Sequence, residues 1–162
     1  MIVRPAERAD LPAILEIYNE VVAHSTAIYV FDASTLEERS EWFESRRRSG
    51  YPVLVAAEGA EVLGFSSFGD FRAPPGYLHT VEHSVHVRAG RRRRGVGRAL
   101  VCALIPLARG LGKHVLIGGI DAENEASLAL HESLGFERVA HFREVGRKFD
   151  RWLDLVFVQT RL

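Results

Sequence analysis

One short segment limits the folds open to this chain more than any other: TVEHSVHVRAGRRRRGVGRALVCAL, residues 80–104. The alternation over residues 80–87 predicts a β-strand, and the apolar spacing after Gly95 predicts an α-helix. An arginine-rich loop joins them. Backbone N–H groups at a helix N-terminus attract phosphate, and Gly95 and Gly97 have no Cβ to hold a ligand away. The segment therefore predicts a strand, a loop and a helix that form a pyrophosphate cradle.

Two common nucleotide motifs do not fit this segment. A Walker A loop needs Gly-Lys-Ser/Thr, which is absent, and a dinucleotide fingerprint needs a third glycine where Leu100 stands. Four arginines at 91–94 are typical of a solvated basic loop, and no aromatic residues alternate with them to stack on bases. The 21 Lys and Arg balance 21 Asp and Glu, so we expect no nucleic-acid partner.

The remaining segments predict further helices and strands. Asp10 should cap a helix from about Leu11 to Ala23, and the capping box Thr35–Glu38 should open a second helix. Pro106 should kink or shorten the helix that begins near Gly95. The other predicted elements are strands at 2–6, 80–87, 113–120, 137–145 and 151–162, a hairpin over 53–68 that turns at Glu58-Gly59, and a helix at 124–136 closed by Gly135. At 162 residues we expect one mixed α+β domain, 1–162.

Composition adds expectations about location and chemistry. The N-terminal residues lack a signal-peptide core and no stretch approaches 18 apolar residues, so we expect a cytoplasmic protein without a membrane partner. Cys102 is the single cysteine, which excludes an internal disulfide and a multi-cysteine zinc site. Period-two geometry puts His79 and His83 on one strand face and His86 on the other, so we expect no metal.

Asn124, Ser127 and His131 fall on one face of the predicted helix 124–136. Taken singly, Asn124 and Ser127 fit a helix cap and first turn, and His131 fits a half-buried position. Beside the phosphate cradle, the shared amide, hydroxyl and imidazole predict one wall of a ligand site.

Several segments resemble a known family. RRRGVG, residues 92–97, matches the Arg/Gln-x-x-Gly-x-Gly/Ala acetyl-CoA signature of the GNAT acetyltransferases, and NEASLALHESLGF is similar to their second motif. FGDFRAPPGYLHTVEHSVHV, GIDAENEASLALHESLGF and EVGRKFDRWLDLVF resemble the branch with phosphinothricin and methionine sulfoximine N-acetyltransferases. The likeness covers essentially the whole chain.

This resemblance implies a fold and an activity. The GNAT fold has a mixed, mostly antiparallel twisted sheet of about seven strands, about four flanking helices and a splayed cleft for acetyl-CoA, the co-substrate. The activity implied is acetyl transfer to the α-amino group of a small amino-acid-like acceptor, by direct attack in a ternary complex rather than through Cys102. A homodimer is also implied, in which the partner helps to close the acceptor pocket.

The resemblance also assigns site residues. An attacking amine must first lose a proton, and the family's T-V-E motif puts that base at Glu82. A backbone N–H from Val85, His86 or Val87 would stabilise the oxyanion. His131 stands where many members have a tyrosine that protonates the leaving thiolate; a structural or pantetheine contact is the alternative. The implied acetyl-CoA contacts are these three strand residues together with Arg92, Arg93, Arg94, Gly95, Val96, Gly97, Arg98, Asn124, Ser127 and His131.

The acceptor site is less defined. An α-carboxylate calls for a cation, for which Arg72 and Lys148 are the candidates, and Tyr29 and Phe31 are candidates for an apolar wall. Relatives often read YRHTVEHSVY where this chain has Leu78 and His86, which bears on the acceptor they tolerate. Acetylation of peptides or proteins on the same scaffold is the alternative function. A non-enzymatic nucleic-acid-binding module is a distant third.

Overall fold

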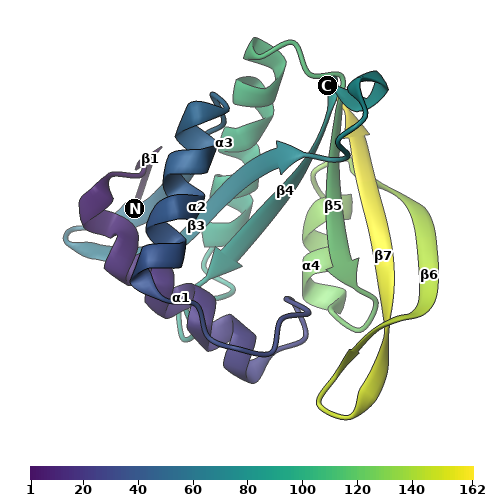
Figure 1. Cartoon of the computed structure of the whole chain (residues 1–162), viewed down its shortest axis with the longest axis horizontal. Helices are drawn as coiled ribbons and strands as arrows, with labels where there is room; N and C mark the ends of the chain where they lie inside the picture. Colours follow the sequence, from purple (N-terminus) through teal and green to yellow (C-terminus); the bar gives the residue numbers. More distant parts are fainter.

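The computed structural model describes residues 1–162, and its seven strands form one twisted sheet (Figure 1). Their order is β1-β2-β3-β4-β5-β7-β6, and every neighbouring pair is antiparallel except β4 and β5. The strands are β1 (Ile2–Pro5), β2 (Val53–Glu58), β3 (Glu61–Asp70), β4 (Thr80–Val87), β5 (Val115–Asp121), β6 (Glu137–Lys148) and β7 (Arg151–Arg161). The predicted mixed α+β fold with a mostly antiparallel sheet is confirmed.

Helices cover both faces of this sheet. Helices α1 (Leu11–His24) and α2 (Leu36–Arg48) lie on one face, and α3 (Val96–Gly110) and α4 (Glu125–Glu132) lie on the other (Figure 1). Two single turns of 3-10 helix, η1 (Arg8–Asp10) and η2 (Pro75–Tyr77), precede α1 and β4. None of the helices is long and apolar enough to cross a bilayer.

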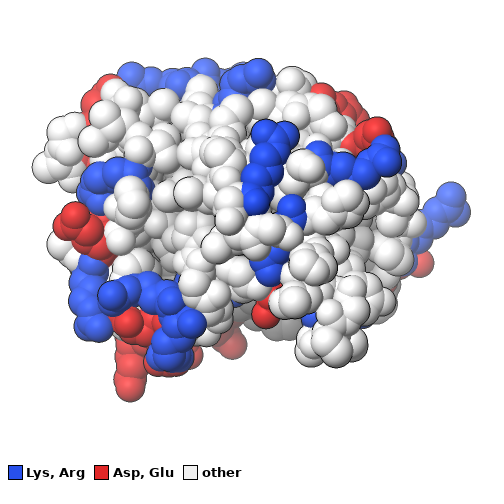
Figure 2. Space-filling model, turned by 90° about the horizontal axis from the view of Figure 1, so that it is seen from above, with Lys and Arg blue, Asp and Glu red and all other residues white.

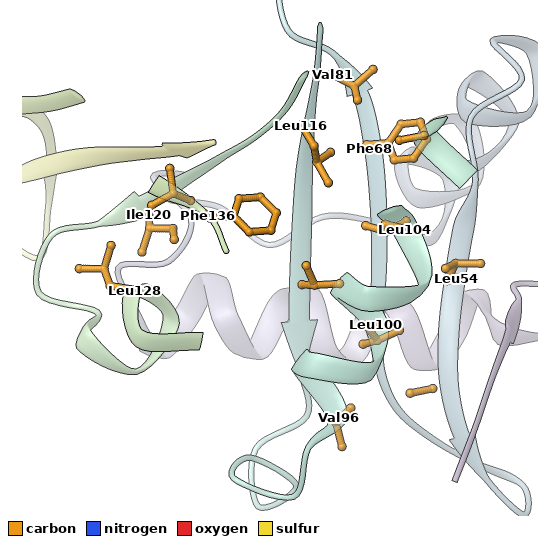
Figure 3. Close-up of a cluster of buried hydrophobic side chains, with 14 of the residues drawn as sticks. Leu54, Phe68, Val81, Val96, Leu100, Leu104, Leu116, Ile120, Leu128 and Phe136 are labelled. Carbon is orange, nitrogen blue, oxygen red and sulfur yellow. The ribbon is translucent and has the colours of Figure 1, made fainter. Parts of the chain in front are cut away.

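Each face of the sheet has its own apolar core. The larger core has 16 buried residues, and Leu100 and Leu104 of α3 pack there with Leu116 of β5 (Figure 3). The smaller core joins α1 and α2 to β2 and β3 through residues such as Ile14 and Phe65. Strands β2 and β3 contribute residues to both cores, and β4 contributes Val81 to the larger one.

Strands β4 and β5 separate part-way along their length. Their parallel pairing covers Thr80–His83 of β4 against Val115–Gly118 of β5, although β4 continues to Val87 and β5 to Asp121. Figure 1 shows the two strands diverging below their paired ends. Beyond His83, the backbone groups on this edge of β4 therefore have no strand partner. The predicted splay of the sheet is confirmed.

Three local predictions need comment. The Thr35–Glu38 capping box is confirmed, because the Thr35 hydroxyl accepts from the Glu38 N–H and the Glu38 carboxylate accepts from the Thr35 N–H. Asp10 is the N-cap residue of α1 as predicted, but its carboxylate makes no cap bond to that helix and accepts instead from Arg4 and the Glu7 N–H. Pro106 does not shorten α3, which runs on to Gly110, with Ala108 buried beyond it.

Charged side chains are distributed over the surface seen in Figure 2. Basic side chains lie there in several separate groups with uncharged surface between them. This distribution agrees with a formal net charge of zero and does not form one continuous basic face in that view.

Candidate active site

Two connected cavities open where β4 and β5 separate. The first, which we call the groove, has a volume of about 460 Å³ and runs between β4, the arginine loop, α3 and α4. The second, which we call the pocket, has a volume of about 430 Å³ and lies between β4, β5, α1 and α2. Val85, His86, Asn124 and Ser127 line both cavities. A ligand in the groove can therefore reach a second ligand in the pocket.

The start of α3 forms one wall of the groove. The first backbone hydrogen bond of this turn runs from the Ala99 N–H to the Gly95 carbonyl, so the preceding N–H groups of the helix are free for a ligand. Gly95 has φ of 78° and Arg93 has φ of 61°, a left-handed conformation that is unusual for arginine. Left-handed residues beside right-handed ones turn successive N–H groups toward one point, which suits an anion.

The loop arginines have different environments. Arg91 pairs with Glu61, Arg92 approaches Glu20 at 3.4 Å, and Arg98 donates to the Ser133 hydroxyl at 2.9 Å. Arg92, Arg93 and Arg98 line the groove, whereas Arg94 does not. Of the other residues predicted to contact acetyl-CoA, Val85, His86, Val87, Gly95, Val96, Gly97, Asn124 and Ser127 line the groove, and His131 lines the pocket.

Glu82 lines the pocket. A Cβ at Gly119 would stand 3.1 Å from the Glu82 Oε1 atom, so the carboxylate lies directly above this glycine of β5. Burial raises the pKa of Glu82 above its ordinary value, and the Arg72 guanidinium partly offsets this rise. A carboxylate with a raised pKa is a stronger base than an exposed one.

An aromatic cluster that the sequence analysis missed forms the far side of the pocket. The Arg39 guanidinium lies 4.0 Å from the ring centroid of Tyr18 and 4.9 Å from that of Trp42. His86 packs against Tyr18 and Phe65, and burial, with Arg39 nearby, lowers its pKa to about 4. His86 is therefore neutral at pH 7. Arg39 and Trp42 stand three residues apart in a predicted helix, and this spacing indicates that they share one face of the helix. The spacing does not indicate which residues pack against that face.

His131 contacts another histidine rather than open space. Its Nε2 atom lies 2.9 Å from Nε2 of His83, and its Nδ1 atom lies 2.7 Å from the Ser127 carbonyl. The His83 Nδ1 atom lies 2.7 Å from the Ile117 carbonyl. Burial lowers the pKa of both rings, that of His83 to about 3, which disfavours an imidazolium at either position. Both Nδ1 atoms face carbonyls and must donate, so in two neutral rings both Nε2 atoms carry lone pairs, and their approach is a contact rather than a hydrogen bond. Of the two predicted roles for His131, this geometry favours the structural one, because both ring nitrogens already contact the protein.

The structure separates the residues predicted for the acceptor. Arg72 is exposed and lies near Glu82. Neither Tyr29 nor Phe31 lines the pocket: the Tyr29 hydroxyl donates to the Asp154 carbonyl, its ring lies against Gly146, and Phe31 is 73% exposed. Ala27 and Ile28 of the same loop line the pocket instead.

Lys148 has a different task from the one predicted. Its ammonium is buried and donates to the carbonyls of Val22, Ser25 and Ile28, at 2.6, 2.8 and 2.8 Å. All three N–H groups of the ammonium are used, so none remains for an acceptor carboxylate. The side chain instead ties β6 to the end of α1 and to the loop that borders the pocket.

We expect Lys148→Met to lower the free energy of unfolding by about 2–4 kcal/mol, because it leaves buried carbonyls without donors. Denaturant unfolding measures this change. Lys113→Met is a matched control: Lys113 donates to one carbonyl, that of Leu78, and should cost less than about 1 kcal/mol. Equal losses for the two variants would contradict the structural role of Lys148.

Comparison with known proteins agrees with this arrangement. The profile of the acetyltransferase (GNAT) domain matches residues 1–137. This chain belongs to the GNAT acetyltransferases. Among curated GNAT relatives, it is 49% identical to the L-amino acid N-acyltransferase MnaT of Escherichia coli (strain K12), over 100% of this chain and 94% of the relative. It is 48% identical to the L-methionine sulfoximine/L-methionine sulfone acetyltransferase of Salmonella typhimurium, over 100% and 95% of the two chains. Identity to the phosphinothricin N-acetyltransferase of Streptomyces coelicolor is 36%, over 99% and 95%.

Solved GNAT structures superimpose on the whole chain. An acetyltransferase from Salmonella typhimurium with its cofactor acetyl-CoA has a TM-score of 0.97 and 47% identity, over 99% of this chain and 93% of that one. A ribosomal-protein-alanine N-acetyltransferase from Brucella melitensis has a TM-score of 0.98 and 48% identity, over 100% of both chains. Both the family and the branch expected from the sequence are confirmed, and the family indicates acetyl-CoA as the ligand.

Proposed function

We propose that this enzyme transfers the acetyl group of acetyl-CoA to the α-amino group of a small amino-acid-like acceptor. The observation that carries the proposal is the position of Glu82: a partly buried carboxylate with a raised pKa, in a pocket that is continuous with the glycine-lined groove. Acetyl-CoA would occupy the groove and the acceptor the pocket. The two would meet beside Val85 and His86, which line both cavities.

The reaction then follows from these positions. Glu82 takes one proton from the acceptor ammonium, directly or through one water, and the free amine attacks the thioester carbon. The edge of β4 beyond His83 has no strand partner, so a backbone N–H near Val85–Val87 is available to stabilise the oxyanion. The C–S bond breaks as the tetrahedral intermediate collapses, and the thiolate of coenzyme A then takes a proton.

The size and charge of the pocket support a small anionic acceptor. About 430 Å³ suits an amino acid. Arg72 is exposed and does not line the pocket, but its guanidinium acts on Glu82, so it would pair with the acceptor carboxylate from outside the pocket lining. The relatives named for L-amino acids, methionine sulfoximine, methionine sulfone and phosphinothricin are consistent with this class.

Acetylation of a protein N-terminus is the second candidate. The solved structure named as a ribosomal-protein-alanine N-acetyltransferase favours it, since that chain is 48% identical over its full length. A peptide acceptor would have no free α-carboxylate beside its amine, so Arg72 distinguishes the two candidates chemically.

A thiol-release assay with acetyl-CoA tests the proposal. We expect saturable turnover with amino acids, methionine sulfoximine, methionine sulfone and phosphinothricin, and none with short peptides. Turnover of peptides alone would favour the second candidate. No turnover with any amine would refute both.

We also propose a homodimer. Strand β6 is an edge of the sheet, and the β6–β7 hairpin exposes Val145, Phe149 and Trp152, with 55%, 55% and 60% of their surface accessible. Exposed apolar side chains on an edge hairpin are typical of an interface.

Light scattering should therefore give about twice the chain mass of 18.1 kDa. Trp152→Glu should shift the mass toward one chain, because it buries a charge in the interface. A wild-type mass near 18.1 kDa at assay concentration would contradict the dimer.

A further inference from the structure

Arg39 of α2 carries a charge that no carboxylate of the pocket neutralises. The residue is half-buried and lines the pocket. The carboxylate that acts on it is that of Glu38, which is turned to the helix cap and accepts the Thr35 N–H. Burial lowers the pKa of Arg39, as expected for a cation held partly out of water. Charges removed from water are normally paired, so this guanidinium is suited to a ligand with oxygen acceptors.

Aromatic rings fix the orientation of this guanidinium. Its Cζ atom lies 4.0 Å from the ring centroid of Tyr18 and 4.9 Å from that of Trp42, and both residues also line the pocket. Stacking of this kind uses the flat face of the guanidinium and leaves the N–H groups on its edge free. The Tyr18 hydroxyl can accept some of them, and the Nε atom is buried without a partner. The two terminal nitrogens are therefore the atoms that can donate to a ligand in the pocket.

Arg39 stands at one end of a row of side chains on β4. Glu82, Ser84 and His86 alternate along this strand and therefore point to the same face of the sheet. All three line the pocket. His86 packs edge-on against the Tyr18 ring, and Arg39 is close enough to contribute to its lowered pKa. Arg39 therefore lies at the His86 end of the row.

Arg72 serves the opposite end of this row. It acts on Glu82, the first residue of the row, whereas Arg39 acts on His86, the last. Four residues of a strand span about 13 Å, so the two guanidinium groups face different parts of a ligand. An acceptor whose amine lies beside β4 and whose α-carboxylate pairs with Arg72 presents its side chain toward Arg39.

We propose that Arg39 binds oxygen atoms at the end of the acceptor side chain and thereby selects acceptors that carry oxo groups or an oxyanion there. This inference rests on the proposed function, because it needs an amino acid in the pocket. The terminal nitrogens of the guanidinium donate hydrogen bonds to the side-chain oxygens. Ile28, Trp42 and Phe65 offer apolar surface to the methylene groups of the acceptor. Arg39 takes part in no proton transfer, so it affects which acceptor binds.

Arg46 is a second half-buried arginine on the same helix. It stands seven residues after Arg39, so the two share one face of α2. Its Nε atom is also buried without a partner. Asp70 acts on Arg46, however, and Arg46 does not line the pocket. Arg46 is therefore the matched control for Arg39.

Two acceptors that differ only in their side-chain oxygens test the inference. Methionine sulfone has the oxo groups that methionine lacks. The wild type should use the sulfone about 10-fold better or more in kcat/KM. Arg39→Met should lower kcat/KM for the sulfone about 10- to 100-fold, because hydrogen bonds from a charged donor are lost. It should change kcat/KM for methionine less than about threefold, and the KM for acetyl-CoA should not change.

Two further variants separate recognition from damage to the fold. Arg39→Lys should keep part of the preference, since it keeps the charge but not the paired N–H groups or the stacking. Arg46→Met should leave the ratio of the two acceptors unchanged. This ratio is measured on one enzyme sample, so it does not depend on how much of a variant is folded. An equal loss for both acceptors in Arg39→Met, or a loss for neither, would overturn the inference.

Failure of the proposed function would be visible separately. If neither amino acid were acetylated, the proposed function would fail, and binding would still decide the role of Arg39. Methionine sulfone should then raise the melting temperature of the wild type more than methionine does, and Arg39→Met should remove that difference. Equal shifts by the two amino acids in the wild type would overturn the inference.

Discussion

Glu82→Gln should lower kcat by about 10²–10⁴-fold, the range typical of general acid–base catalysis. Glutamine keeps the shape of the side chain above Gly119 but cannot take the proton of the acceptor ammonium. The carboxylate lies outside the groove, so the KM for acetyl-CoA should stay close to that of the wild type. Steady-state assays over both substrates measure this separation.

The pH profile gives an independent check on Glu82. Burial raises its pKa, so the acid limb of kcat/KM in the wild type should lie above the ordinary carboxyl value of 4.5. The base must be ionised, so activity is lost as pH falls through this raised pKa. Glu82→Gln should flatten that limb. Glu82→Asp should retain a limb with reduced kcat, because it preserves basicity and changes only reach.

Near-normal kcat and an intact acid limb in Glu82→Gln would assign Glu82 to substrate positioning. The proton would then leave through water or a histidine. His86 and His131 are poorly suited to this task, because burial lowers the pKa of both rings and His131 already contacts protein atoms through both nitrogens.

The groove could be predicted from the sequence because its parts are local. Gly95, Gly97 and the strand that precedes them lie within 18 residues, and a helix N-terminus beside close-approach glycines favours an anion, although this pattern alone does not require one. Capping at Thr35 was predictable for the same reason, since the box spans four residues. The separation of β4 from β5 depends on residues that are far apart in the sequence. Hydrophobic periodicity could not predict this separation, whereas the family resemblance did.

The acceptor side of the pocket depends on distant contacts, and there the sequence was a weaker guide. Lys148 looks like a free cation in GRKFDRW, but its partners are carbonyls more than 100 residues earlier in the chain. Arg39 and Trp42 fit an ordinary helix face.

Gly97→Val should raise the KM for acetyl-CoA about 10- to 100-fold, the value of one lost hydrogen bond to a charged phosphate. A Cβ at this position would stand 3.3 Å from Cδ2 of Leu130 and 3.7 Å from Cγ2 of Val87. Both neighbours line the groove, so the added methyl groups must occupy the space of the ligand beside the free N–H groups of α3. The kcat at saturating acetyl-CoA should change little, because Glu82 is untouched.

Two controls separate ligand exclusion from damage to the helix. Gly110→Val makes the same change at the other end of α3, where a Cβ would meet nothing within 4 Å, and should leave the KM unchanged. Gly97→Ala should give an intermediate KM, since its single methyl group needs only a small shift of Leu130. Valine has a higher helix propensity than glycine, so a weakened helix would not account for the loss at position 97. If Gly97→Val binds acetyl-CoA as tightly as the wild type does, the ligand does not approach the backbone of α3, and the phosphates must bind elsewhere along the arginine loop.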